Sequence, residues 1–353
     1  MQYRQLGRSG LRVSELTLGT MGFAGSGKFR DVGEIDVKGA RRQVDMAIDA
    51  GVNLIDTADI YSAGASEEVV GEVVKGRRDQ LLIATKARFE MGPGANDAGL
   101  SRHHLIEACE ASLRRLQTDH IDLYQVHEWD GQTPLEETLA ALEHLLHSGK
   151  VRYVGCSNFA GWQVMKALRI AERDHLPAFV SQQVYLSLQE RSAEYEIVPS
   201  AIDQGLGLLI WSPLAGGLLS GKYRRGEAAP EGSRLAGEWS EPPVYDEDKL
   251  YDTIETLVAV AENRGVSPAQ VAIAWLLARP GVSTVIIAAR TEAQLADNLA
   301  AVSLELSADE LDRLEAVSRP TLIYPFWHHA FTANDRLSAA DLSLIEPHLR
   351  SRT

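Results

Sequence analysis

The segment IDLYQVH at residues 121–127, followed by TPLEETLAALEHLLH at residues 133–147, decides the fold. The first is a short, nearly continuous apolar run, typical of a parallel strand that is covered on both faces. The second predicts a helix, because Thr133 is a suitable N-cap, Pro134 fits the first helical position and Glu136 completes a capping box. Apolar residues then recur at helical spacing: Leu135, Leu139, Leu142 and Leu146.

The same strand-then-helix alternation extends along the chain in both directions. Seven further strands are predicted at LTLGTM (16–21), NLIDTA (53–58), LLIATK (81–86), RYVGCS (152–157), VSQQV (180–184), GLLIWS (207–212) and STVIIA (283–288). Eight strands, each followed by a helix, are the count of a (β/α)8 TIM barrel. The competing fold, a doubly wound sheet, usually has a phosphate-binding loop near its start, and none is present here. We therefore predict an α/β protein with one barrel domain over residues 1–353.

Three segments exceed the minimal barrel. Residues 1–15 predict an N-terminal β-hairpin with its turn at residues 7–10. Residues 224–245 are rich in Gly, Pro and charge and follow the seventh strand, where they are predicted to form a lid; a passive insertion is the alternative. Residues 319–353 form a C-terminal extension whose start, TLIYPFWHHAF, is too aromatic for a disordered tail.

The composition excludes several classes of protein. A net charge of −14 argues against binding to nucleic acid or to an anionic membrane surface. No apolar run is long enough to span a membrane, and the N-terminus lacks the apolar core of a signal peptide. Cys109 and Cys156 are predicted to be buried, reduced thiols, which fits the cytoplasm. No metal site is predicted, since His144 and His147 do not form an HExxH motif with Glu143. The oligomeric state is not predicted.

Ionisable residues follow three consecutive predicted strands. Asp56 ends the second strand, with Tyr61 five residues later, Lys86 ends the third and His127 ends the fourth. Taken singly, Asp56 could cap a loop, Lys86 could end a strand in solvent and His127 could be a core histidine. In a barrel, however, the carboxyl ends of all strands meet at the face that carries the active site. We therefore predict that the four side chains converge.

The four residue types together suit a particular chemistry. A free tyrosine has a pKa near 10 and is a poor proton donor at neutral pH, but a nearby lysine ammonium lowers that pKa. An aspartate beside the lysine keeps the ammonium charged, and a histidine beside the tyrosine orients a carbonyl or relays a proton. Such a set protonates an oxygen while a hydride reaches the carbon. Because no side chain is a redox group, the hydride must come from a cofactor.

The sequence resembles the aldo-keto reductase family over nearly its whole length. The matching segments are LGRSGLRVSELTLGTMGF, NLIDTADIYSAGASEEVVGE, IATKAR, IDLYQVHEWD, VRYVGCSNF and WSPLAGGLLSGKY. The resemblance implies an NADP(H)-dependent oxidoreductase that reduces an aldehyde or ketone to an alcohol. Tyr61 would be the general acid, Lys86 and Asp56 would tune it, and His127 would position the substrate carbonyl.

The resemblance also implies a set of cofactor contacts without a Rossmann loop. Ser157, Asn158 and Gln182 would hold the carboxamide, and Trp211 would stack on the nicotinamide ring. Residues along the pyrophosphate would be Ser212, Leu214, Gly216 and Lys222. The adenosine end would meet Arg290, Gln294 and Asn298, with help from Arg234 of the lid. Further cofactor contacts are assigned to Gly19, Thr20, Met21, Pro213, Leu218 and Ala288. Substrate contacts are assigned to Phe23, Trp129, Tyr324, Phe326 and Trp327.

One of these assignments has independent support in the residues. Arg290 directly precedes a predicted helix that is capped by Thr291 and Gln294. An arginine at a helix N-terminus is a good site for a phosphate dianion, which favours NADP over NAD. Glu292 in the first turn opposes this preference, because an acid there favours a free ribose hydroxyl.

Two other functions stay open. The same residues run in reverse would oxidise an alcohol or a sugar hydroxyl, with Tyr61 as the base. A third reading is an NADPH-binding regulatory protein, since WSPLAGGLLSGKY also resembles potassium-channel beta subunits. The expected small-molecule partner is thus a carbonyl compound or an alcohol.

Overall fold

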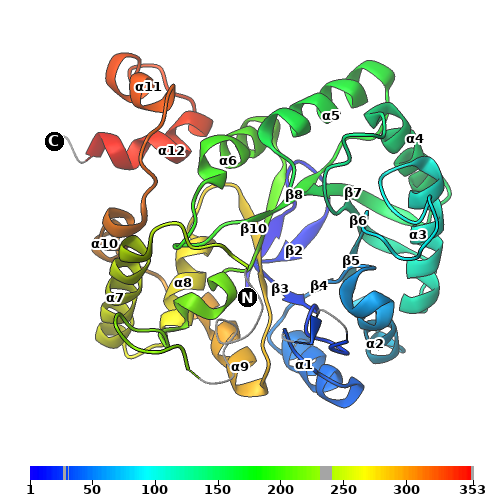
Figure 1. Ribbon diagram of the computed structural model, residues 1–353, viewed down its shortest axis with the longest axis horizontal. Helices are drawn as coiled ribbons and strands as arrows, with labels where there is room; N and C mark the ends of the chain where they lie inside the picture. The colour runs from blue at the N-terminus through cyan, green and yellow to red at the C-terminus, as the bar shows by residue number, and fades with distance from the viewer. Residues whose placement is uncertain (27–28, 31, 231–240, 351–353) are drawn as a thin grey trace.

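A closed barrel of eight parallel strands forms the centre of the structure (Figure 1). The computed structural model describes residues 1–26, 29–30, 32–230 and 241–350. Around the barrel the strands follow the order β10, β3, β4, β5, β6, β7, β8, β9, so that β10 closes on β3. Their bounds are β3 Leu16–Gly19, β4 Leu54–Asp56, β5 Leu82–Ala87, β6 Ile121–Val126, β7 Val151–Ser157, β8 Ser181–Tyr185, β9 Gly207–Trp211 and β10 Val282–Ile287. All eight predicted strands and the predicted fold class are confirmed.

Helices surround the barrel and cover the outer face of its strands (Figure 1). They are α1 Val37–Asp49, α2 Ala65–Val74, α3 Arg102–Leu116, α4 Leu135–His147, α5 Gly161–Asp174, α6 Ala193–Gln204, α7 Glu247–Arg264, α8 Pro268–Leu277, α9 Glu292–Ala300 and α10 Ala308–Ser318. Short 3₁₀ turns lie at Tyr61–Gly64, Arg78–Gln80, Ala215–Ser220 and Ala301–Ser303. The main apolar core fills the space between strands and helices. None of the helices within the described residues combines the length and the hydrophobicity that a membrane crossing needs.

The helix predicted at residues 133–147 is confirmed, but its predicted cap is wrong. α4 begins after Pro134, and no side chain caps it. The Thr133 hydroxyl instead donates to Asp130 Oδ2 at 2.7 Å, and Glu136 pairs with Arg173 of α5. Because the Thr133 hydroxyl bonds Asp130, it does not cap the N-terminus of α4.

The predicted N-terminal hairpin is confirmed and closes the amino-terminal end of the barrel. β1 (Tyr3–Gln5) pairs antiparallel with β2 (Arg12–Ser14). Leu6 and Val13 pack against apolar residues inside the barrel. Gly7 packs directly against backbone atoms around residues 205–207, and an added Cβ there would lie 2.5 Å from the Gly205 carbonyl oxygen. Among the described residues the hairpin therefore covers the amino-terminal end of the barrel.

The C-terminal extension packs on the outside of the barrel, beyond α6 (Figure 1). It contains α11 (Phe326–Thr332) and α12 (Ala339–Arg350). The Phe326 ring stacks on Tyr195 of α6 at 5.8 Å, and the Tyr195 hydroxyl donates to the Thr321 carbonyl oxygen. Phe326 thus helps to attach this segment to α6.

Candidate active site

The four predicted catalytic residues converge at the carboxyl-terminal end of the barrel. Asp56 is the last residue of β4, Lys86 is the penultimate residue of β5 and His127 directly follows β6. Tyr61 lies on the short turn after β4. Asp56 and Lys86 are buried, and the Tyr61 and His127 rings meet edge to face at 6.0 Å.

The Lys86 ammonium group connects this set. Its Nζ donates to Asp56 Oδ2 at 2.6 Å, to the Thr57 carbonyl oxygen at 2.8 Å and to the Tyr61 hydroxyl at 3.4 Å. These acceptors satisfy the three N–H bonds of an ammonium group. Burial lowers the pKa of Lys86, but the Asp56 carboxylate and Tyr61 more than offset it, so that the pKa is raised. The lysine is therefore held as a cation.

The other oxygen of Asp56 is bound by glutamine side chains of β8, across the barrel, and of β6. Gln183 Nε2 of β8 donates to Asp56 Oδ1 at 2.7 Å, and Gln125 Nε2 donates at 3.4 Å. Gln182, predicted to hold the carboxamide, instead donates to the Phe159 carbonyl oxygen and does not line the pocket. Side chains alternate along a strand, so only one of two successive glutamines can face the site. That residue is Gln183, and the assignment to Gln182 is wrong.

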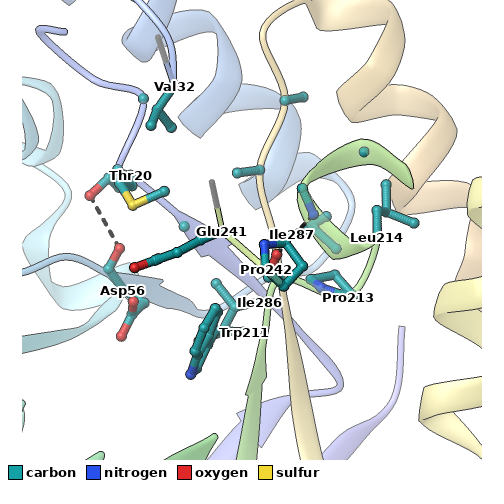
Figure 2. A pocket seen from close by; sticks show the side chains of 18 of the residues that line it. Thr20, Val32, Asp56, Trp211, Pro213, Leu214, Glu241, Pro242, Ile286 and Ile287 are labelled. Carbon is teal, nitrogen blue, oxygen red and sulfur yellow. Dashed lines mark hydrogen bonds between the residues drawn. The ribbon is translucent and has the colours of Figure 1, made fainter. Parts of the chain in front are cut away.

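One large pocket extends over this end of the barrel, with a volume of about 1210 Å³. Figure 2 shows Thr20 and Asp56 on one side of it and Pro213 and Leu214 on the other, with Glu241 and Pro242 between them. Most predicted cofactor residues line this pocket: Gly19, Thr20, Met21, Ser157, Asn158, Trp211, Ser212, Pro213, Leu214, Gly216, Lys222, Ala288, Arg290, Gln294 and Asn298. Leu218 does not, because its side chain belongs to the main core, and that prediction is wrong. Arg234 lies outside the described residues.

Of the predicted substrate residues, only Phe23 lines the pocket. Trp129 instead packs against Phe159 and Trp162. The three predicted residues of the C-terminal extension lie beyond α6, where Tyr324 is 72% exposed. Their assignment to the substrate site is wrong: Tyr324, Phe326 and Trp327.

The structure adds lining residues that the sequence did not single out. Phe29 follows β3, whereas Phe89 and Glu128 lie two residues after the ends of β5 and β6. The last two could have been found, because they lie at strand ends like Lys86 and His127. Pro230 and residues 241–243, from the two described ends of the predicted lid segment, also line the pocket.

The pocket's chemistry fits a dinucleotide. Trp211 presents a flat ring near the catalytic end, where its Nε1 donates to Asn158 Oδ1 at 3.1 Å. The cations that line the described pocket are Lys222 and Arg290. Arg290 precedes α9, whose N-terminus has the predicted capping box of Thr291 and Gln294. A long cavity with amides and an aromatic ring at one end and cations at the other suits a nicotinamide dinucleotide.

Comparison with known proteins agrees with this geometry. The family model described as "Aldo/keto reductase family" matches residues 15–319. The chain belongs to the aldo/keto reductase family. It is therefore an oxidoreductase that uses a nicotinamide cofactor.

Relatives in this family carry different names. An uncharacterized oxidoreductase of Bacillus subtilis, YrpG, is 41% identical over 328 residues, which cover 90% of this chain and 96% of the relative. A probable voltage-gated potassium channel subunit beta of Arabidopsis thaliana is 38% identical over 325 residues, with the same coverage. A rice protein of the same description is 38% identical over 326 residues, again with the same coverage.

In this aldo/keto reductase, burial controls the acidity of Tyr61. Burial raises its pKa above the usual value, and the nearby Lys86 ammonium only partly offsets that effect. Lys86 lowers the tyrosine pKa, as expected, but burial outweighs it, so the pKa of Tyr61 is not lowered overall. The Phe29 and His127 rings pack edge to face against the Tyr61 ring, and the Lys86 Nζ lies 3.4 Å from its hydroxyl. The hydroxyl accordingly keeps its proton at neutral pH.

Three successive left-handed residues hold the turn that carries Tyr61. The φ angles are 51° at Ser62, 55° at Ala63 and 94° at Gly64. The Ser26 backbone N–H donates to Ser62 Oγ at 3.1 Å. On the other side, an added Cβ at Gly64 would lie 2.7 Å from Cδ of Arg115. Left-handed backbone at non-glycine residues is costly and concentrates at functional sites.

This packing predicts that Gly64→Ala destabilises the protein by about 2–3 kcal/mol, from the left-handed φ together with the clash with Arg115. Urea unfolding measures the loss. Gly76→Ala is the matched control, because its φ is +81° and no atom lies within 4 Å of the added Cβ. We expect the control to cost about 1 kcal/mol. Equal losses in the two variants would show that contact with Arg115 does not constrain the turn.

Proposed function

We propose that the protein reduces an aldehyde or ketone to an alcohol with NADPH, and that Tyr61 is the general acid. The observation that supports this most is the Lys86 ammonium group, which bonds both the Asp56 carboxylate and the Tyr61 hydroxyl at one end of the pocket. When bound, NADPH supplies the hydride that the side chains lack.

Each side chain then has a separate role. The Tyr61 hydroxyl donates its proton to the carbonyl oxygen. Lys86 stabilises the phenolate that remains, and Asp56 keeps the lysine charged and in place. His127, beside the Tyr61 ring, positions the carbonyl oxygen. Phe29 and Phe89 meet the Tyr61 and His127 rings edge to face and keep water from this end of the pocket.

A preference for NADP over NAD is supported at the far end of the pocket. Arg290 precedes the N-terminus of α9, where its guanidinium can pair with the 2′-phosphate. Glu292, the acid that opposes this preference, forms an ion pair with Arg42 of α1. Arg42 therefore offsets the negative charge that would repel the phosphate.

We expect Arg290→Gln to weaken NADPH binding by roughly ten- to a hundredfold. This is the loss of a charge-assisted hydrogen bond of about 1.5–3 kcal/mol, at 1.4 kcal/mol per factor of ten. NADH lacks the 2′-phosphate, so its affinity should change little. Fluorescence titration with each cofactor measures both constants. A parallel loss of NADH affinity would mean that Arg290 does not contact the 2′-phosphate.

The names of two relatives support a second candidate function. Two relatives are described as probable voltage-gated potassium channel beta subunits. A protein that binds NADPH and reports its occupancy to a partner would retain the pocket without using it for catalysis. NADPH oxidation by the purified protein with a panel of aldehydes and ketones separates the two. Turnover supports the reductase, whereas tight binding without turnover of any carbonyl or alcohol supports the regulatory role.

The cellular setting is also inferred. Cys109 and Cys156 are both free and buried. Unpaired thiols are typical of a reducing compartment, and we infer the cytoplasm. Fractionation of the source cells tests this.

A further inference from the structure

The catalytic end of the pocket is lined by phenyl rings and by one acid that forms no ion pair among the described residues. Phe29 contacts the Tyr61 ring at 5.6 Å and Phe89 contacts the His127 ring at 4.9 Å. Phe23 is buried and lines the same pocket. Glu128, the residue directly after His127, is the acid. The substrate's remaining groups must therefore lie among apolar rings and beside a carboxylate.

The Glu128 side chain is held in place. The Trp129 backbone N–H donates to Glu128 Oε1 at 3.4 Å, and the Asn158 amide donates to the Glu128 carboxylate. Asn158 also accepts from Trp211 Nε1 and donates to the His127 carbonyl oxygen. The Asn158 amide thus links the Glu128 carboxylate to the Trp211 ring and to the backbone of His127. Partial burial raises the pKa of Glu128, while the Trp129 N–H, the Arg88 charge and Asn158 each act to lower it.

Within the described part of the pocket no side chain forms an ion pair with Glu128, although the charge of nearby Arg88 acts to lower its pKa. Arg88 is the nearby cation, but its guanidinium lies over the Phe89 ring at 5.5 Å, and no ion pair joins it to Glu128 among the described residues. The Lys86 ammonium is taken by Asp56, Thr57 and Tyr61. Lys222 belongs to the loop after β9, away from β6 and its neighbours. A negatively charged substrate group would therefore be repelled by the Glu128 carboxylate.

We propose that Glu128 makes the enzyme selective for carbonyl compounds without an acidic group, such as uncharged aromatic aldehydes, and against carboxylated or phosphorylated ones. This inference rests on the proposed reductase function. Like charges placed together at a binding site cost affinity and serve to exclude wrong partners. Among the lining residues, Glu241 has the same sign and adds to the exclusion; Figure 2 shows its side chain extending from the segment of Pro242 across the pocket.

A pair of substrates that differ only in charge tests the proposal. Methyl 4-formylbenzoate and 4-formylbenzoate have the same ring and the same reacting aldehyde. At pH 8 with NADPH, we expect the wild-type kcat/KM to be at least about tenfold higher for the ester than for the acid. E128Q keeps the size of the side chain and removes its charge. It should reduce this ratio at least fivefold, through a gain for the acid.

The control variant is E90Q, which removes an exposed acid one residue beyond Phe89 and should leave the ratio at its wild-type value. A ratio that is the same in E128Q and the wild type would overturn the proposal. Affinities of both aldehydes for the protein, measured by tryptophan fluorescence, provide a readout that needs no turnover. If neither aldehyde is reduced, the proposed reductase fails, and the ratio of affinities in E128Q and the wild type still decides the role of Glu128.

Discussion

Tyr61→Phe is expected to lower kcat for carbonyl reduction by about 10²–10⁴-fold, the usual contribution of a positioned general acid. The substitution removes only the hydroxyl that Lys86 approaches at 3.4 Å and keeps the ring contacts with Phe29 and His127. Steady-state assays with excess NADPH and aldehyde measure kcat. Tyr195→Phe is the control, because that hydroxyl bonds the Thr321 carbonyl oxygen on the outer side of α6. Equal rates in Tyr61→Phe and the wild type would refute the assignment.

The pH dependence provides a second test of the same residue. In the proposed mechanism reduction requires Tyr61 with its proton, and burial raises the pKa of that hydroxyl above its ordinary value near 10. The rate constant for reduction should therefore stay level from about pH 6 to about pH 9 and fall only at higher pH. Alcohol oxidation requires the phenolate, so its rate should rise over the range in which reduction declines. A fall in reduction near pH 7 would point to a different proton donor.

The barrel and the catalytic set could be predicted because each depends on local sequence. Apolar runs such as residues 121–127 are long enough to bury on both faces, and turn and helix signals separate them. Asp56, Lys86 and His127 then fall together because every parallel strand in a barrel ends at the same face.

The errors concern features that only tertiary packing decides. Gln182 and Gln183 are chemically identical, and only the strand register determines which of them bonds Asp56. Thr133 does not cap α4, because its hydroxyl bonds Asp130, three residues earlier in the chain. The aromatic residues after Arg319 suited a pocket in composition, yet they lie on a helix pair outside the barrel that Phe326 helps to attach to α6, and composition carries no information on that placement.

The pKa of Tyr61 shows that a nearby lysine does not by itself determine the acidity of a tyrosine. The sequence correctly indicates that a lysine lies beside the tyrosine, and the charge does lower the pKa. The sequence does not indicate how deeply the Tyr61 side chain is buried. Burial disfavours the phenolate, and here it outweighs the charge. In the proposed mechanism Lys86 therefore acts mainly after Tyr61 has given up its proton. Its positive charge then stabilises the buried phenolate, which burial alone would disfavour.

Lys86→Met is the other substitution with a large expected effect, on both stability and activity. It leaves the Asp56 carboxylate buried with only the Gln183 and Gln125 amides, and an unpaired buried charge costs about 3–5 kcal/mol. It also removes the charge beside the Tyr61 hydroxyl, so reduction should fall by at least about a hundredfold. Urea unfolding and single-turnover assays measure the two losses.

The double variant Asp56→Leu with Lys86→Met separates stability from catalysis. Replacing both members of a buried ion pair with apolar residues is often neutral for stability, so we expect most of the lost unfolding free energy to return. Activity should not return, because Tyr61 still lacks the ammonium group. A double variant that stays as unstable as Lys86→Met would mean that the loss comes from packing around the lysine stem. A double variant that regains activity would show that Lys86 acts only by keeping the fold intact, and Tyr61 would then need another source of phenolate stabilisation.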